Sequence, residues 1–113
     1  MEKHNRHILL TFDLEEFDLP VEYGIKINED EQMAMGKKGL DEINEILDYN
    51  SMNCTIFTTA NFALRYPSQV AALSTDHEIA SHTFFHSSFK RCDLKNSRQV
   101  LEDIVSKKVN GIR

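Results

Sequence analysis

The sequence predicts an α/β fold in which three β-α units build one parallel sheet. Two observations lead to this prediction. Short runs of apolar and β-branched residues alternate with segments whose apolar residues recur at helical spacing, which is the pattern of parallel strands joined by right-handed helical crossovers. Acidic residues and histidines follow the first and third runs, where sheets of this kind place their sites. With 113 residues, the chain has room for one domain and no more.

Three segments are predicted to be strands. Residues 7–12 form a compact apolar run that is typical of a buried parallel strand. Residues 54–59 are rich in β-branched side chains, and residues 77–82 form a short third strand. Because parallel strands end at the same edge of a sheet, we expect the residues that follow them to lie close together.

The segments between the strands are predicted to be helical. Apolar residues at helical spacing predict a helix that ends near Asn50, Pro67 suits the first turn of the next helix, and Asp93 is expected to cap the last one. Residues 18–36 are polar, contain five carboxylates and are predicted to form a long loop. A loop of this length often covers a site in a compact domain, and a solvated acidic loop is the alternative.

Composition and charge exclude several kinds of partner. The net charge is −5, and no basic patch is present to release counterions, so nucleic acid and anionic membranes are not expected as partners. No apolar run approaches the ~20 residues of a membrane span. The N-terminal segment 1–7 is charged and the apolar run after it is too short for a signal peptide, so a cytoplasmic location is expected. Cys54 and Cys92 form no disulfide framework, which fits a reducing compartment.

Two histidines and a cluster of acids supply the candidate site. His82 and His86 lie four residues apart after the third predicted strand, and they can converge on one ion if the chain turns there. Asp13 and Glu15 follow the first strand and point to the same side, whereas Glu16 points to the opposite side. A chance pair of histidines and ordinary ion pairing of the acids are the alternatives. The convergence of all four groups at one edge of the sheet favours a metal site.

These ligand types indicate hydrolysis assisted by a metal ion. Two imidazoles and one carboxylate leave a coordination position open for water, as in catalytic zinc sites. Zinc is favoured, and cobalt, manganese, iron or nickel are also compatible with these ligands. The ion activates water and polarises a carbonyl oxygen, and a free carboxylate beside it takes the proton of the water. The expected reaction is therefore hydrolysis of an amide or ester, with a metal ion and a base but no obvious acid.

Two segments resemble motifs of the polysaccharide deacetylases, the NodB-homology domain of carbohydrate esterase family four. Residues 11–13, Thr-Phe-Asp, resemble the first motif, and residues 77–86 resemble the second motif, His-[Ser/Thr]-x-x-His, with its usual lead-in. Residues 111–113 resemble the start of the third motif, Arg-x-Pro. The order and separation of the motifs make the match strong, and the resemblance covers residues 1–113 as the N-terminal part of a single such domain.

The resemblance implies a (β/α) barrel of the deacetylase type that removes N-acetyl groups from amino sugars, here as an incomplete half. Asp13 would be the general base, His82 and His86 would bind the metal with a carboxylate, and Arg113 would pair with Asp13 at the substrate. Most members have two adjacent acids, whereas this chain has the spacing of Asp13 and Glu15 that some branches use, and Glu16 stays an alternative ligand. The strands that close the barrel and the histidine that acts as general acid lie in the later part of the family domain. We therefore expect metal binding with little turnover, and self-association through the open edge of the barrel.

Two other functions are compatible with parts of the pattern. Acids after a first parallel strand also hold magnesium in phosphoryl-transfer domains, but such a site has no use for His82 and His86. A non-catalytic, metal-stabilised carbohydrate-binding or assembly module derived from a deacetylase is the second alternative. It would bind metal and glycan without turnover.

Overall fold

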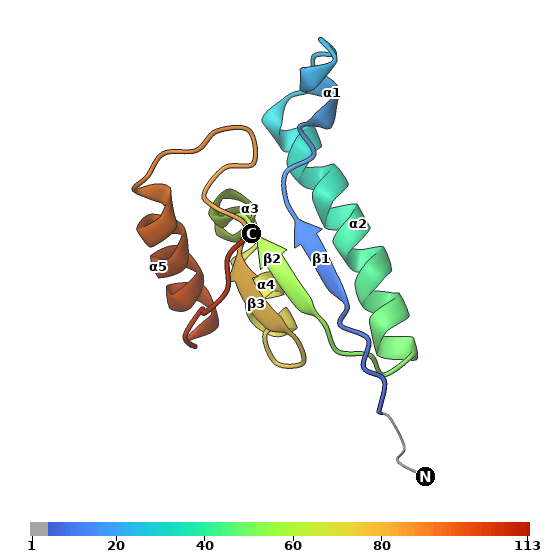
Figure 1. Cartoon of the computed structure of the whole chain (residues 1–113). Helices are drawn as coiled ribbons and strands as arrows, with labels where there is room; N and C mark the ends of the chain where they lie inside the picture. Colours follow the sequence, from blue (N-terminus) through green and yellow to red (C-terminus); the bar gives the residue numbers. More distant parts are fainter. Residues whose placement is uncertain (1–4) are drawn as a thin grey trace.

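Three parallel strands form the sheet, in the order β1-β2-β3, and helices connect them (Figure 1). The computed structural model describes residues 5–113, so the first four residues of the charged N-terminal segment lie outside it. The predicted α/β class with three parallel strands is confirmed. The elements are β1 (Thr11–Leu14), α1 (Leu19–Glu22), α2 (Glu29–Tyr49), β2 (Thr55–Thr58), α3 (Ala60–Arg65), α4 (Pro67–Leu73), β3 (Glu78–Ser81) and α5 (Asp93–Val105).

The first strand begins later than predicted. It was expected over residues 7–12 and lies at Thr11–Leu14, while Ile8 and Leu9 are each 91% exposed. The reason lies in its neighbour, because β2 begins only at Thr55, whose backbone N–H donates to the carbonyl of Leu10. A strand needs a hydrogen-bonded partner, so the apolar residues before Leu10 remain outside the sheet.

The prediction of a long loop over residues 18–36 is wrong, because this segment contains α1 and the first part of α2. Asn28 begins α2, and its side-chain oxygen accepts a hydrogen bond of 2.8 Å from the backbone N–H of Glu31. The acids of the first turn, 29–31, lie beside the positive end of the helix dipole, where negative charge is favourable. These acids therefore start a helix that is about 32 Å long and are not loop residues.

Two smaller differences concern the other helices. Asp93 is the first residue of α5 and makes no cap to it, since its side chain accepts a hydrogen bond from the backbone N–H of Lys90. Helix α3 was not predicted. Thr59 caps it by accepting a hydrogen bond from the backbone N–H of Phe62, a residue that is fully buried.

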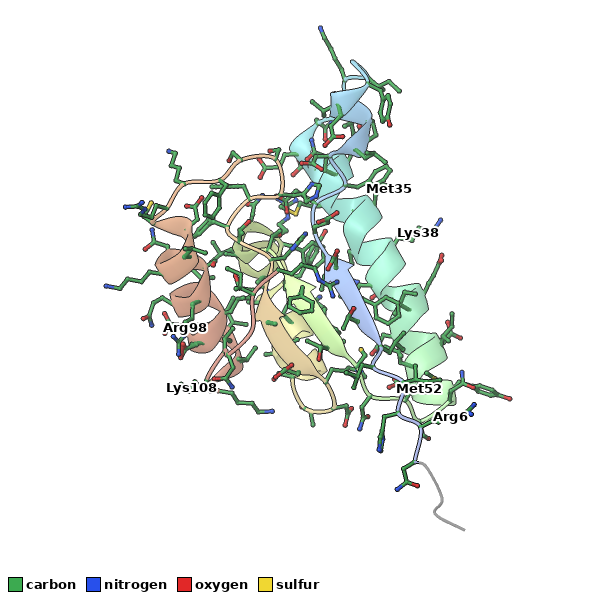
Figure 2. The ribbon with its side chains drawn as sticks, viewed as in Figure 1. Arg6, Met35, Lys38, Met52, Arg98 and Lys108 are labelled. Atoms are coloured by element: carbon green, nitrogen blue, oxygen red, sulfur yellow. The ribbon has the colours of Figure 1, made fainter. Side chains whose placement is uncertain are left out.

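Helices pack against the sheet and enclose the core. Figure 1 shows α2 beside β1, α5 beside β3, and α3 and α4 behind the strands. Charged residues of the outer helices, such as Lys38 of α2 and Arg98 of α5, lie on opposite flanks of the molecule (Figure 2). The buried apolar residues include Leu14, Met33, Leu40, Leu47, Ile56, Phe62, Val70, Ile79, Leu101 and Val105. No helix in the described part of the chain has the length and apolar character needed to cross a bilayer.

The sheet is open at β1. Within residues 5–113, β1 pairs with β2 alone, and a groove of about 380 Å³ lies between β1 and α2. On the other side, Ile112 forms an isolated parallel bridge with Ser81 of β3, so the chain continues the sheet in sequence order. Sequential parallel strands that do not close are the arrangement expected for part of a (β/α) barrel. Self-association through the open edge stays a prediction.

Gly36 permits a close approach between α2 and the segment that follows β1. A Cβ atom at this position would clash with the backbone carbonyl oxygen of Glu15 and would lie 3.0 Å from the ring of Phe62. A Cβ atom at Gly39, about one turn further along α2, would have no atom of the described residues within 4 Å. The helix can therefore carry a side chain at one of these glycines and not at the other.

We expect Gly36→Ala to lower the free energy of unfolding by about 1–3 kcal/mol, because overpacking forces the backbone of Glu15 away from α2. The matched control Gly39→Ala removes a glycine from the same helix and should raise the stability by about 0.5–1 kcal/mol. Urea unfolding followed by circular dichroism measures both changes. Equal effects of the two substitutions would contradict the close approach.

Candidate metal centre

The register of the sheet brings the predicted site residues to one edge. Leu14 pairs with Thr58, and Thr58 pairs with Ser81, so the three strands end at the same level. Glu15 leaves the sheet after β1, and His82 leaves it after β3. The structure therefore brings together, from opposite strands of the sheet, the acid and the imidazole that the sequence places after strands one and three.

Three potential ligand atoms converge at this edge. The Oε2 atom of Glu15 lies 3.0 Å from Nε2 of His82 and 3.2 Å from Nε2 of His86. One ligand atom from each residue lies within 4.8 Å of the other two. Their side chains are 29%, 17% and 29% exposed, so the cluster is partly shielded and still open to a small molecule.

A tight turn after β3 brings His86 back to His82. Thr83 adopts a left-handed conformation with φ of 65°, which is unusual for a β-branched residue and costs about 1–3 kcal/mol. The N-terminal backbone amides of α3 hold the turn, because Ala60 donates to the carbonyl of Thr83 at 3.0 Å and Asn61 donates to that of Phe84 at 2.9 Å. The first turn of α3 thereby fixes the loop that carries both imidazoles.

The partners of the two Nδ1 atoms determine how the imidazoles face the cluster. Nδ1 of His82 lies 2.8 Å from the backbone carbonyl oxygen of Arg113, and Nδ1 of His86 lies 2.6 Å from Oδ1 of Asp18. A carbonyl and a carboxylate only accept hydrogen bonds, so each Nδ1 carries the hydrogen. Both Nε2 atoms of the neutral rings then direct their electron pairs toward Glu15.

This arrangement fits a bound cation. Oε2 of Glu15 is buried and has no hydrogen-bond donor among residues 5–113, and two nitrogen electron pairs face it at close range. The contact with Glu15 raises the pKa of His82, because a proton on Nε2 would be shared with the carboxylate. A divalent metal ion meets the same need for positive charge, and an N₂O ligand set with open positions is typical of catalytic zinc.

Asp13 lies beside the cluster and pairs with Arg113. Nη1 of Arg113 donates to Oδ1 of Asp13 at 2.9 Å, and Nη2 donates to the hydroxyl of Thr11 at 3.0 Å. The guanidinium also lies over the ring of Phe57, 4.2 Å from its centroid. The backbone N–H of Arg113 donates to the carbonyl of Ser81, which anchors the arginine to β3. The pairing of Asp13 with Arg113 that the resemblance implied is therefore present.

Glu16 and Asp18 contact His86 in a way that the sequence did not indicate. Glu16 is 4% exposed, and its two oxygens accept hydrogen bonds from the hydroxyl of Thr59 at 2.7 Å and from the backbone N–H of His86 at 2.9 Å. Both oxygens are thus engaged away from the cluster, which distinguishes Glu16 from Glu15 as a ligand. The strand alternation had placed Glu16 on the opposite side, but nothing in the sequence separated Asp18 from the other acids of the predicted loop.

Comparison with known proteins gives a consistent picture of the fold. A family model described as "Polysaccharide deacetylase" matches residues 1–113. A putative polysaccharide deacetylase from Mycobacterium smegmatis is similar with a TM-score of 0.71 and 22% identity, over 93% of this chain and 41% of that chain. The allantoinase Puue is similar with a TM-score of 0.66 and 17% identity, over 90% of this chain and 44% of that chain.

A pseudoenzyme is also among the similar structures. A CE4 family pseudoenzyme from Bacillus anthracis has a TM-score of 0.64 and 17% identity, over 92% of this chain and 33% of that chain. The chain thus spans between a third and a half of the length of these three structures. The search of curated proteins gave no match.

We expect Glu15→Gln to weaken zinc binding by more than about 100-fold, which exceeds the usual effect of losing an outer-shell partner. The substitution removes the negative charge from the atom that faces both imidazoles. Competition with a chromophoric chelator measures the affinity. Glu22→Gln on α1 removes an exposed carboxylate and should leave the affinity unchanged. Equal affinities of the two variants would exclude Glu15 as a ligand.

Proposed function

The chain belongs to the polysaccharide deacetylase family, and from this premise we propose that it carries the metal site and the general base of an enzyme that hydrolyses the N-acetyl amide of an amino sugar. One observation supports the proposal most strongly. The carboxylate of Glu15 and the imidazoles of His82 and His86 converge at the carboxyl edge of the sheet, beside the pair formed by Asp13 and Arg113. Hydrolysis of a carbon–nitrogen bond needs an electrophile and a base at one point, and this edge offers groups suited to both.

Glu15, His82 and His86 are proposed to hold a divalent ion, with zinc favoured over cobalt, manganese, iron or nickel. Imidazole nitrogens suit these ions, whereas magnesium prefers oxygen ligands, which argues against a phosphoryl-transfer site. A divalent ion supplies Lewis acidity toward a carbonyl oxygen and lowers the pKa of water. The protein's part is to keep the hydrogen of each neutral ring on Nδ1, so that both Nε2 electron pairs face one point.

Asp13 is the proposed general base. Arg113 holds one oxygen of this carboxylate at 2.9 Å, which stabilises the anion and leaves the second oxygen to accept a proton from water. Thr11 and Phe57 fix the guanidinium in turn, so the carboxylate has little freedom to rotate. Asp13 is 39% exposed at its side chain, and a substrate can therefore reach it.

The described residues offer no imidazole to protonate the leaving amine. His77 lies before β3, at the opposite end of the sheet, where its Nδ1 accepts a hydrogen bond from the backbone N–H of Cys54. His7 is exposed and precedes β1. Amide hydrolysis requires such a proton because an amine anion is a poor leaving group, whereas an ester with an acidic alcohol does not.

A non-catalytic module is the second candidate. One of the similar structures is described as a pseudoenzyme of the CE4 family, so this fold exists with and without turnover. In that case the chain binds a metal ion and a glycan that carries N-acetyl groups, and Asp13 has no catalytic role. The two candidates differ in whether a bound acyl group is hydrolysed.

We expect the zinc-loaded protein to hydrolyse 4-nitrophenyl acetate, because this leaving group departs without a proton. Asp13→Asn should abolish the zinc-dependent part of the rate while zinc affinity stays within about threefold of the wild type, since Asp13 is proposed as base and not as ligand. Release of 4-nitrophenol, measured by absorbance with and without zinc, gives the rate. Acetate release from N-acetylglucosamine oligomers by the 113-residue chain should remain near background.

Asp41→Asn is the control, because Asp41 is an exposed acid of α2 that pairs, within residues 5–113, with Lys37 alone. Its rate should equal that of the wild type. Zinc binding and glycan binding without any zinc-dependent ester hydrolysis would overturn the catalytic proposal in favour of the non-catalytic module. Clear acetate release from the oligomers would instead show that a proton donor other than a histidine acts in this chain.

A further inference from the structure

The two imidazoles of the cluster are held by chemically different partners. His82 donates through Nδ1 to the main-chain oxygen of Arg113 at 2.8 Å, whereas His86 donates through Nδ1 to the side-chain carboxylate of Asp18 at 2.6 Å. His86 is therefore the imidazole whose orientation depends on a side chain.

The side chain of Asp18 contacts His86 and does not cap helix α1. It occupies the N-cap position of α1, where an aspartate normally accepts a hydrogen bond from a backbone N–H of the first turn. Its side chain makes no such bond, is 6% exposed as a residue, and faces the ring of His86 instead. The backbone on both sides is fixed, since Asp18 donates to the carbonyl of Glu16 and its own carbonyl accepts from Val21.

A second acid, Glu16, accepts a hydrogen bond from the backbone of the same histidine. Oε1 of Glu16 accepts a hydrogen bond of 2.9 Å from the backbone N–H of His86, and Thr59 fixes the other oxygen. Two acids that are two positions apart in the chain thus hold the main chain and the ring of a residue about 70 positions later. The main chain of His86 remains fixed by Glu16 even when the contact to its ring is removed.

We propose that Asp18 is a positioning residue that selects the Nδ1–H form of His86 and directs its Nε2 atom toward the ion. This inference rests on the proposed function only in that a divalent ion binds at Glu15, His82 and His86. A carboxylate behind a ligating imidazole fixes the ring and strengthens the other nitrogen as an electron-pair donor. Asp18 contacts neither substrate nor ion and acts through His86 alone.

Two substitutions of Asp18 separate its effect on the orientation of the His86 ring from the effect of its negative charge. Asp18→Asn keeps an oxygen that accepts from Nδ1 but removes the negative charge, and Asp18→Ala removes both. Zinc affinity, measured by chelator competition, should fall by about 10–100-fold for Asp18→Ala and by a smaller factor for Asp18→Asn. Asp30→Asn is the control, because Asp30 is an exposed acid of α2 that pairs with Arg65, and its affinity should equal that of the wild type.

The tautomer of the His86 ring gives a second readout that needs no metal. ¹⁵N NMR of the metal-free protein at alkaline pH should show His86 with its hydrogen on Nδ1 in the wild type and in Asp18→Asn. In Asp18→Ala the hydrogen should move toward Nε2, while His82 keeps its form because its partner is unchanged. A residue with a purely structural role would not change the form of a single imidazole.

Each outcome decides one proposal. If the wild type binds zinc and Asp18→Ala binds it equally well with His86 unchanged, the positioning role is overturned and the proposed function stands. If the wild type binds no zinc, the proposed function fails, and the NMR measurement still decides whether Asp18 orients His86. If Asp18→Ala does not fold, as judged by circular dichroism, unchanged zinc affinity of the isosteric Asp18→Asn overturns the role of the charge.

Discussion

The contact of one carboxylate oxygen with two imidazole nitrogens is the constraint on which the rest of the site depends. Oε2 of Glu15 lies 3.0 and 3.2 Å from the Nε2 atoms of His82 and His86, and both Nδ1 atoms already donate to other acceptors. Three electron-pair donors at this range repel each other, and the buried oxygen has lost its hydration. A proton shared between Nε2 of His82 and Glu15 relieves this repulsion, and a divalent cation would relieve it as well, so the fold must hold the three atoms together against it when neither is present.

The backbone that holds the ligand residues in place belongs to strands and helix ends and not to loops alone. The level ends of β1 and β3 set the distance between Glu15 and His82, and the first amides of α3 hold the strained turn at Thr83. Helix α2 approaches the backbone of Glu15 at Gly36, where no side chain intervenes. A site that is built on strands and helix ends keeps its geometry better than one built on mobile segments. The cost of the left-handed Thr83 is balanced by the hydrogen bonds that α3 makes to the turn.

The similar structures show that this fold does not by itself specify an activity. They include a protein described as a putative polysaccharide deacetylase, an allantoinase and a pseudoenzyme at 17–22% identity, a level at which the fold alone is shown to be shared. The present chain has the acid-x-acid spacing of Asp13 and Glu15, followed by the two buried acids Glu16 and Asp18. Their contacts give each of these acids a different environment: a guanidinium, two imidazoles, a hydroxyl with a backbone amide, and a single imidazole.

The sequence by itself predicted the parallel α/β fold and the meeting of an acid after the first strand with His82 and His86, because strand patterns and the level ends of parallel strands are local or topological properties. It favoured Glu15 and left Glu16 as an alternative ligand. It did not reveal that residues 18–36 are largely helical, since the acids that start α2 resemble loop composition when their cap is not recognised. Only the tertiary structure decided the role of Asp18. Its contact joins residues 68 positions apart in the chain, and it depends on the path of a loop that no periodicity describes.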